Sequence, residues 1–247
     1  MILSYYDNQA LGSIVLFIHG IGSAKEIWHK QYDLLKQNGY RVIGVDLRGH
    51  GSSSKPEGVS TVDDHVSDLY ETLNHLCINQ KITIVGHSFG AVLAVKLTEK
   101  YPEKVNNLLL ASFPVKVPTV LLKYYKWLLG KPLEFLKKKT NLILKLPLKK
   151  RYKLVINSDL NIVRQVWKES LEWDFLSNIP KVQCPIHLSV GRFDYISLVT
   201  VVRRLHNRLQ SSSCKIFNWS SHTCMEDEPR EFNKWLAYTL STEKVNL

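Results

Sequence analysis

The stretch Val85-Gly86-His87-Ser88-Phe89-Gly90 decides the fold of this chain. It continues residues 81–85, a short β-branched apolar run that predicts a buried strand. It precedes residues 91–98, whose composition predicts a helix. A serine with a glycine two positions before it and another two positions after it therefore occupies a strand-to-helix turn. In that context the pattern G-x-S-x-G forms a nucleophile elbow.

The elbow requires glycine for a steric reason. The turn is so tight that the serine is held in a strained backbone conformation, and both flanking positions have almost no room for a side chain. The strain directs the hydroxyl of Ser88 out of the sheet, above the N-terminus of the following helix. We expect the backbone N–H of Phe89 to be free there to bind a developing oxyanion.

A second glycine-rich turn, His19-Gly20-Ile21-Gly22, follows the apolar run 14–18, which is typical of a strand buried on both faces. Ligands bind at the carboxyl ends of parallel strands in open α/β sheets. We predict that the N–H of Ile21 supplies the second oxyanion donor. The alternative is a turn that needs glycine only for its geometry.

Strand-like runs alternate with helical stretches along most of the chain. The expected strands cover residues 14–18, 40–46, 81–85, 105–111, 185–191 and 215–217. The expected helices of this alternating part cover residues 24–38, 61–76, 91–98 and 199–209, with an amphipathic helix at the C-terminus. This alternation predicts right-handed crossovers and a mostly parallel sheet with helices on both faces.

Residues 113–180 interrupt the alternation. They contain 14 Lys or Arg against 5 Asp or Glu, whereas the rest of the chain has 19 against 17. The net charge of +11 therefore belongs mainly to this segment. Its pattern is helical, and its last helix is expected to include Ile162 and Trp173. We interpret 113–180 as a helical lid inserted into a core formed by 1–112 and 181–247.

The lid combines aromatic and aliphatic residues with lysine clusters at Lys137–Lys139 and Lys149–Arg151. One hypothesis is that it binds a membrane surface, with the lysines facing anionic headgroups. The simpler interpretation, which we favour, places its apolar face over a pocket and its lysines in water. No nucleic-acid recognition fold accompanies the charge, so we expect no nucleic-acid partner.

The composition is that of an ordinary soluble protein, with 45% apolar and 22% charged residues. No apolar run approaches the ~18 residues that span a bilayer, and no secretory signal is visible. The four cysteines lack metal-binding spacing, which predicts free thiols in a reducing, cytoplasmic compartment. They are Cys77, Cys184, Cys214 and Cys224.

A serine nucleophile needs a base, and the base needs an orienting acid. On a sheet of this kind the chain order is serine, then acid, then histidine. Asp194 follows the strand 185–191, and His222 follows the last strand. The sheet would bring both to the edge that carries Ser88, so we predict Ser88, Asp194 and His222 as the catalytic set. Asp159 and Asp174 are weaker candidates for the acid.

The remaining histidines and acids have simpler interpretations. His19 and His87 flank the site as polar lining, and His50 lies in a glycine turn. Asp46 is expected to accept turn N–H bonds, with Arg48 nearby. Another acidic group is more typical of a solvated helix face, capped by a threonine, than of a metal site. That group consists of Asp63, Asp64, His65 and Asp68.

These motifs together resemble the α/β-hydrolase superfamily, in the capped branch that includes esterases and hydrolases of carbon–carbon bonds. Residues 19–22 resemble its oxyanion turn, and residues 46–52 resemble its structural D-x-R-G-x-G-x-S segment. Residues 86–90 resemble its elbow, and Asp194 and His222 match its acid and base. The short N-terminal segment predicts that one or two edge strands are missing. The lid matches no subfamily signature.

The resemblance implies a reaction class. Related dehalogenases and epoxide hydrolases carry aspartate at the elbow, whereas this chain has Ser88. The implied reaction is transfer of an acyl group to water from a small-molecule ester or thioester. A carbon–carbon bond hydrolase or an acyltransferase would use the same residues, and a receptor-like protein could retain the fold. No metal or organic cofactor is expected for any of these.

Overall fold

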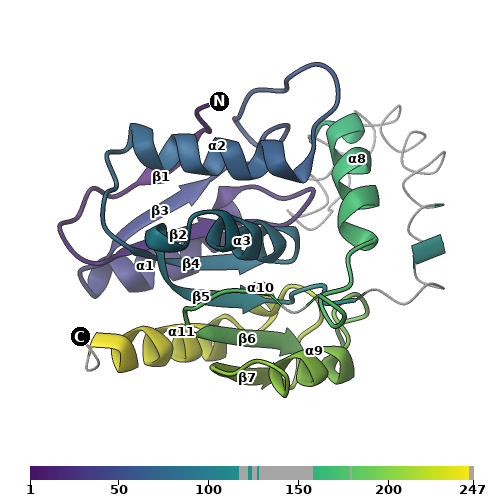
Figure 1. Cartoon of the computed structure of the whole chain (residues 1–247). Coiled ribbons are helices and arrows are strands. Elements are labelled where there is room, and N and C mark those ends of the chain that lie inside the picture. Colours follow the sequence, from purple (N-terminus) through teal and green to yellow (C-terminus); the bar gives the residue numbers. More distant parts are fainter. Residues whose placement is uncertain (117–121, 124–126, 128–157, 179, 245–247) are drawn as a thin grey trace, which may run out of the picture.

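A seven-stranded sheet with helices on both faces organises the computed structural model of the chain (Figure 1). The structure describes residues 1–116, 122–123, 127, 158–178 and 180–244. The strands follow the order β1-β3-β2-β4-β5-β6-β7 across the sheet. They are β1 (Tyr5–Asp7), β2 (Ile14–Ile18), β3 (Arg41–Val45), β4 (Ile82–His87), β5 (Val105–Ala111), β6 (Ile186–Gly191) and β7 (Ser212–Phe217).

All neighbouring strands from β3 to β7 pair in parallel, as the alternation predicted. The short segment before the strand 14–18 forms one edge strand, β1, which pairs antiparallel with β3 and places Tyr5 opposite Val45. Three residues are too few to show a strand period in the sequence. The strand β7 also begins three residues earlier than expected, at Ser212.

Helices cover both faces of the sheet. On one face α2 (Val62–His75), α3 (Phe89–Lys100) and α9 (Val199–His206) enclose one apolar cluster. On the other face α1 (His29–Gln37) and α11 (Pro229–Lys244) enclose a second cluster. Shorter helical turns complete the connections. These are η1 (Lys25–Trp28), η2 (Pro102–Lys104) and α10 (Cys224–Asp227).

The central strands β2 and β4 are buried along their whole length. Their continuous apolar sequences suit a parallel sheet that is covered on both faces. Because these two strands are neighbours and run in the same direction, the turns that follow them emerge side by side. The fold thereby brings the turn at 19–22 next to the turn that contains Ser88.

The described part of the segment 113–180 includes α8 (Leu160–Leu171). Trp173, which we expected in this helix, lies two residues beyond its end. Figure 1 shows α8 standing across the ends of α2 and α3, on the side toward which the parallel strands point. It is tied to the core because Asp159 N–H donates to the Gly49 carbonyl (2.8 Å) and Val62 N–H donates to Glu169 (3.1 Å).

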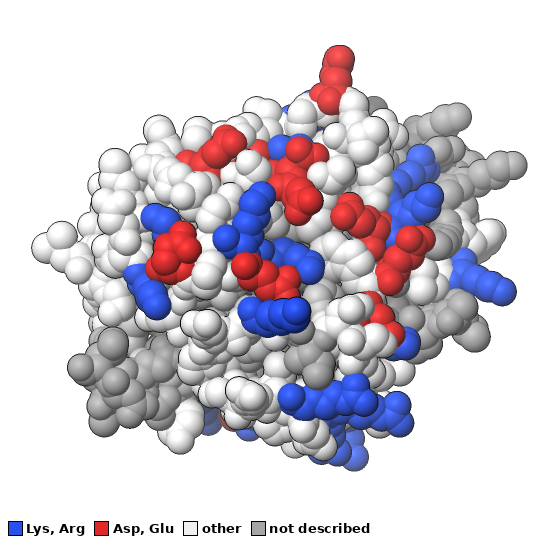
Figure 2. Space-filling model, viewed as in Figure 1, with Lys and Arg blue, Asp and Glu red and all other residues white. Residues whose placement is uncertain are grey.

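Charges of both signs lie interspersed over the face shown in Figure 2. The expected lysine clusters at Lys137–Lys139 and Lys149–Arg151 lie outside the described residues.

The four cysteines are free, as predicted. Within the ranges that the structure describes, no helix is long and apolar enough to cross a membrane.

The helix α2 differs in one respect from the sequence-based expectation. Its capping box is confirmed, since Thr61 and Asp64 exchange side-chain and backbone hydrogen bonds. However, His65 and Asp68 are buried rather than solvated. Asp68 accepts two hydrogen bonds from the Arg48 guanidinium, at 2.7 and 2.8 Å, so this face of the helix packs against the turn after β3.

Candidate active site

The elbow has the geometry that its glycines predicted. Ser88 lies between β4 and α3 with φ 53° and ψ −115°, a strained conformation for a residue with a side chain. A Cβ atom at Gly86 would lie 2.5 Å from the carbonyl oxygen of Gly90. A Cβ atom at Gly90 would lie 2.3 Å from the carbonyl oxygen of Ile18. Both contacts are with backbone atoms, so neither position accommodates a larger residue without displacing the turn.

The three residues predicted to act together lie within hydrogen-bonding distance. The Ser88 hydroxyl oxygen is 2.9 Å from Nε2 of His222. Nδ1 of His222 is 3.0 Å from each carboxylate oxygen of Asp194. Oδ1 of Asp194 also accepts the backbone N–H groups of Ile196 (2.9 Å) and Ser197 (2.8 Å). The three side chains come from the turns after β4, β6 and β7, at one edge of the sheet.

The electrostatics of Asp194 favour its ionised form. Burial by itself would raise the pKa of this carboxyl group, but the neighbouring His222 and the two backbone N–H donors outweigh it and lower the pKa. A carboxylate only accepts hydrogen bonds, so we place the proton of neutral His222 on Nδ1. Nε2 then faces the Ser88 hydroxyl with a free lone pair.

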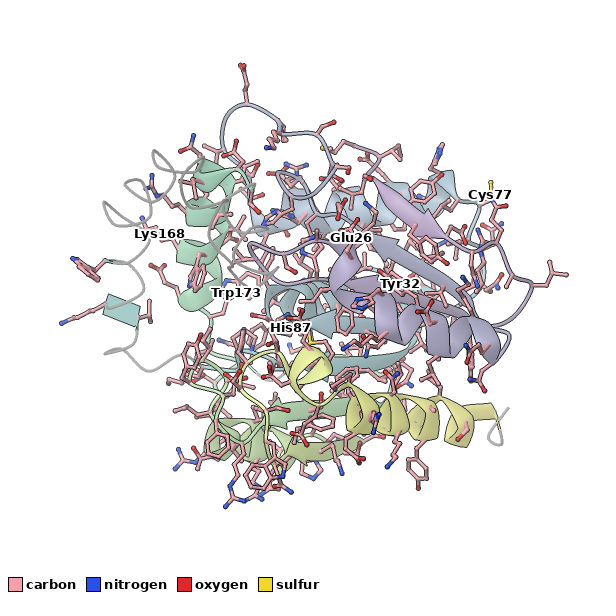
Figure 3. All side chains as sticks on the ribbon, turned by 180° about the vertical axis from the view of Figure 1, so that it is seen from behind. Glu26, Tyr32, Cys77, His87, Lys168 and Trp173 are labelled. Carbon is pink, nitrogen blue, oxygen red and sulfur yellow. The ribbon has the colours of Figure 1, made fainter. Side chains whose placement is uncertain are left out.

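His87 holds the backbone of the candidate base. Its Nε2 lies 2.9 Å from the carbonyl oxygen of His222, to which it donates. Figure 3 places His87 at the centre of the molecule, beside the yellow segment around α10. Burial lowers the pKa of His87 to about 3, so the ring is neutral. The sequence predicted a lining residue, but not a contact with a residue 135 positions away.

His19 fixes the turn predicted to hold an oxyanion donor. Its Nδ1 lies 2.7 Å from the Gly20 carbonyl oxygen, and its Nε2 accepts the N–H of Leu47 (3.0 Å). Burial lowers the pKa of His19 to about 3. A Cβ atom at Gly20 would lie 3.2 Å from Cβ of Ser88, so this turn lies directly against the elbow. Ile21 is the next residue.

Two backbone N–H groups are therefore placed near Ser88. Phe89 is the first residue of α3, so its N–H has no partner within the helix. The N–H of Ile21 belongs to the turn that contacts the elbow. Phe89 follows Ser88 directly, and Ile21 follows Gly20, whose turn lies against the elbow. That their N–H groups bind an oxyanion remains a prediction.

The other candidate acids are engaged elsewhere. Asp159 caps α8 by accepting the N–H groups of Asn161 and Ile162. Asp174 pairs with Lys116 and with the N–H and hydroxyl of Ser177. Neither has a hydrogen bond to His222, so Asp194 is the acid that the geometry favours.

Asp46 has the expected structural position with a different partner. It accepts the N–H groups of Lys25 (2.8 Å) and Ser52 (2.9 Å) and pairs with the Lys25 ammonium. Burial would raise the pKa of Asp46, but these donors lower it. Arg48, which we expected nearby, forms its hydrogen bonds with Asp68 on α2. The residues that the structure describes include no cluster of three or more metal-ligating side chains.

Comparison with known proteins identifies the fold. A family profile described as alpha/beta hydrolase fold matches residues 13–178. An uncharacterised protein of Mycobacterium tuberculosis is 37% identical over 101 residues, which are 41% of this chain and 29% of that protein. The human protein ABHD8 is 29% identical over 100 residues, 40% of this chain and 23% of that protein. The chain thus matches less than a third of the length of these relatives.

Solved structures match the chain over almost its full length. A thermophilic esterase from Thermogutta terrifontis has a TM-score of 0.81 and 22% identity, covering 97% of this chain and 93% of its own. A bromoperoxidase from Bacillus anthracis has a TM-score of 0.82 and 23% identity, covering 96% and 94%. The enol-lactonase from Burkholderia xenovorans has a TM-score of 0.81 and 15% identity, covering 97% and 96%.

Proposed function

Because the chain belongs to the α/β-hydrolase fold family, we propose that it is a serine hydrolase that cleaves carboxylic esters or thioesters. One observation carries the proposal. The Ser88 hydroxyl is 2.9 Å from Nε2 of His222, whose Nδ1 is 3.0 Å from the carboxylate of Asp194. Acyl transfer to a serine requires a nucleophilic serine, an imidazole within hydrogen-bonding distance of its hydroxyl, and a carboxylate that orients the imidazole.

In the first half of the proposed reaction, the Ser88 oxygen attacks the carbonyl carbon of the substrate while its proton passes to Nε2 of His222. Asp194 stabilises the imidazolium that forms and does not itself take the proton. The tetrahedral intermediate collapses as the carbon–oxygen or carbon–sulfur bond breaks. The leaving group receives the proton from His222, and the acyl group remains on Ser88.

In the second half, His222 takes a proton from water, whose oxygen attacks the acyl-enzyme. Collapse of the second intermediate returns the proton to the Ser88 oxygen and releases the carboxylic acid. In both intermediates the negative charge on the former carbonyl oxygen is bound by the N–H groups of Ile21 and Phe89. Fixed N–H donors of this kind stabilise charge at the moment it develops.

The proposal extends to the segment 113–180 as a lid over this site. The contacts of α8 with the turn at Gly49 and with the start of α2 support it, since they place a helix of the segment at the edge of the sheet that carries Ser88. The presence of a named esterase among proteins of similar fold agrees with ester hydrolysis. The lid would then set the size of the acyl group that the site accepts.

The test is hydrolysis of p-nitrophenyl esters from acetyl to palmitoyl by the wild type and by Ser88→Ala. The matched control is Ser112→Ala, another buried serine at a positive φ whose hydroxyl has no hydrogen bond to the three residues. We expect turnover in the wild type and in the control, and a loss of about 10⁴-fold or more in Ser88→Ala.

Turnover by Ser88→Ala at the wild-type rate would refute the assignment. If the wild type cleaves none of the esters, the ester proposal fails. Acyl-CoA thioesters, β-diketones and alcohol acceptors then test thioesterase, carbon–carbon hydrolase and acyltransferase activity on the same residues. Absence of Ser88-dependent chemistry with all of them would favour a binding protein that retains the fold.

A further inference from the structure

Three large aromatic side chains are exposed beside the candidate acid and base. Phe193 is 60% exposed, Tyr195 is 56% exposed and Trp219 is 81% exposed. The first two flank Asp194, and the third lies three residues before His222. We call Phe193, Tyr195 and Trp219 the aromatic rim.

The rim residues belong to one surface because their loops are joined. The N–H of Phe193 donates to the carbonyl of Ser220 (3.0 Å), the neighbour of Trp219. The N–H of Arg192 donates to the carbonyl of Phe217 (2.8 Å). The ring of Tyr195 lies 6.4 Å from the ring of His222. The rim therefore borders the candidate base through Tyr195.

Exposed single aromatic residues are common, but here three of them stand on two loops that are hydrogen-bonded to each other. Apolar residues grouped on the surface of a soluble protein mark an interaction site. Their positions are not needed for the core. The residue between Phe193 and Tyr195 is the buried Asp194, which accepts the N–H groups of Ile196 and Ser197. An aromatic ring with a polar edge, as in Tyr and Trp, suits a boundary between water and lipid.

Basic side chains lie in the loop that carries Phe193 and Tyr195 and in the last turn of the helix that follows it. Arg192 is exposed within the same loop, and the helix α9, which begins four residues after Tyr195, exposes Arg203 and Arg204. Figure 2 shows Lys and Arg side chains gathered at the lower right, where α9 lies in Figure 1. Arginine beside aromatic residues favours a surface that is anionic outside and apolar beneath, which describes an acidic lipid bilayer.

Two acidic side chains near Trp219 are committed to local structure. Glu228 accepts the N–H of Trp219 (2.8 Å) and the hydroxyl of Ser220 (2.6 Å). Asp227 accepts the N–H and hydroxyl of Ser221, at 2.9 and 2.7 Å. They hold the loop before His222 in place, and neither carboxylate forms an ion pair with Arg203 or Arg204.

We propose that the aromatic rim and the arginines of α9 dock the protein on an anionic lipid surface. The rings enter the headgroup region, the guanidinium groups pair with lipid phosphates and carboxylates, and the edge of the sheet that carries Ser88 faces the bilayer. The residues of this surface belong to the core and not to the segment 113–180. The proposal concerns binding and does not depend on the reaction proposed for Ser88.

The test is co-sedimentation of the full chain with vesicles of phosphatidylcholine alone and of phosphatidylcholine with phosphatidylserine. All variants carry Ser88→Ala, so that lipid cleavage does not enter the measurement. The rim variant is Phe193→Ser with Trp219→Ser, and the charge variant is Arg203→Glu with Arg204→Glu. The matched control is Tyr238→Ser, which removes another exposed aromatic side chain (71% exposed) from α11.

We expect binding to the anionic vesicles and weaker binding to the neutral ones. Both double variants should bind the anionic vesicles at least about tenfold more weakly, while the control binds as before. Thermal denaturation establishes that each variant folds. The proposal is overturned if the parent binds neither vesicle or if the folded rim variant binds normally. It is also overturned if neutralising Lys137–Lys139 alone abolishes binding, since the lid would then be the contact.

Discussion

Replacing Asp194 by asparagine tests the candidate active site with the smallest change of shape. Oδ1 of Asp194 accepts the N–H groups of Ile196 and Ser197, so the carbonyl oxygen of the asparagine must occupy that position. The amide NH₂ group then replaces Oδ2, which lies 3.0 Å from Nδ1 of His222. An NH₂ group only donates hydrogen bonds. Nδ1 of His222 then lies 3.0 Å from an oxygen that already accepts two N–H groups and 3.0 Å from an NH₂ donor. The donor favours the imidazole tautomer whose proton is on Nε2.

The size of the effect follows from that change of tautomer. With a proton on Nε2, the ring donates to the Ser88 oxygen 2.9 Å away and cannot take its proton. The imidazolium formed during attack also loses its neighbouring negative charge. A wrong tautomer with intact geometry lowers kcat by about 10⁴-fold in serine hydrolases. We therefore expect kcat of Asp194→Asn to fall by roughly 10³ to 10⁴-fold, about 4 to 5.5 kcal/mol in activation free energy.

The assay is steady-state hydrolysis of the p-nitrophenyl ester that the wild type cleaves fastest. The matched control is Asp174→Asn, which removes a carboxylate paired with the half-exposed Lys116. Its kcat should change by less than about threefold, because a solvent-exposed ion pair contributes little. KM should be similar in all three proteins, since Asp194 lies behind the imidazole ring and has no contact with the scissile bond in the proposed mechanism.

Two results would refute this reasoning. One is an Asp194→Asn enzyme with kcat within tenfold of the wild type, which would mean that another group orients His222. The other is an equal loss in Asp174→Asn, which would make the acid in the lid segment the functional partner. Urea denaturation of both variants separates these outcomes from a simple loss of folding.

Further predictions concern the elbow and the turn after β3. Gly90→Ala would place Cβ 2.3 Å from the Ile18 carbonyl oxygen; we expect urea denaturation to show a loss of about 1 to 3 kcal/mol in stability and ester assays to show reduced kcat. Asp46→Asn should lower stability at neutral pH by roughly 1 to 3 kcal/mol, because it leaves Lys25 without its buried carboxylate. The pKa of Asp46 is lowered in the folded protein, so its contribution is complete above the pKa of the unfolded chain and is lost as the pH falls through the folded value. Denaturation curves of Asp46→Asn and wild type should therefore converge on acidification, and a constant difference at all pH values would contradict this account.

Much of the site could be predicted because its residues are tied to strand ends. An apolar β-branched run followed by G-x-S-x-G specifies an elbow, since only glycine fits at positions 86 and 90. Parallel strands end at one edge, so the residues after β6 and β7 had to lie near Ser88. The order of the chain then selected Asp194 and His222, whose side chains the structure brings within hydrogen-bonding distance.

The missed features depend on contacts between distant segments. A three-residue strand such as β1 has no period to detect, and it exists because β3 offers an edge with which to pair. The acid that binds Arg48 is decided by the packing of α2, because this packing places Asp68 beside the guanidinium. His65 has the local pattern of a helix surface but is buried against Phe89.

The sequence by itself determined the strained serine, the alternation that produces a parallel sheet, and the residue types of the three-member set. These depend on local sterics and on periodicity, both of which are properties of short stretches. Only the tertiary structure decided that His87 supports the backbone of His222, that Lys25 neutralises Asp46, and that Tyr195 lies beside the candidate base. Such contacts arise when separate loops meet at a sheet edge, and no pattern within one stretch encodes where they meet.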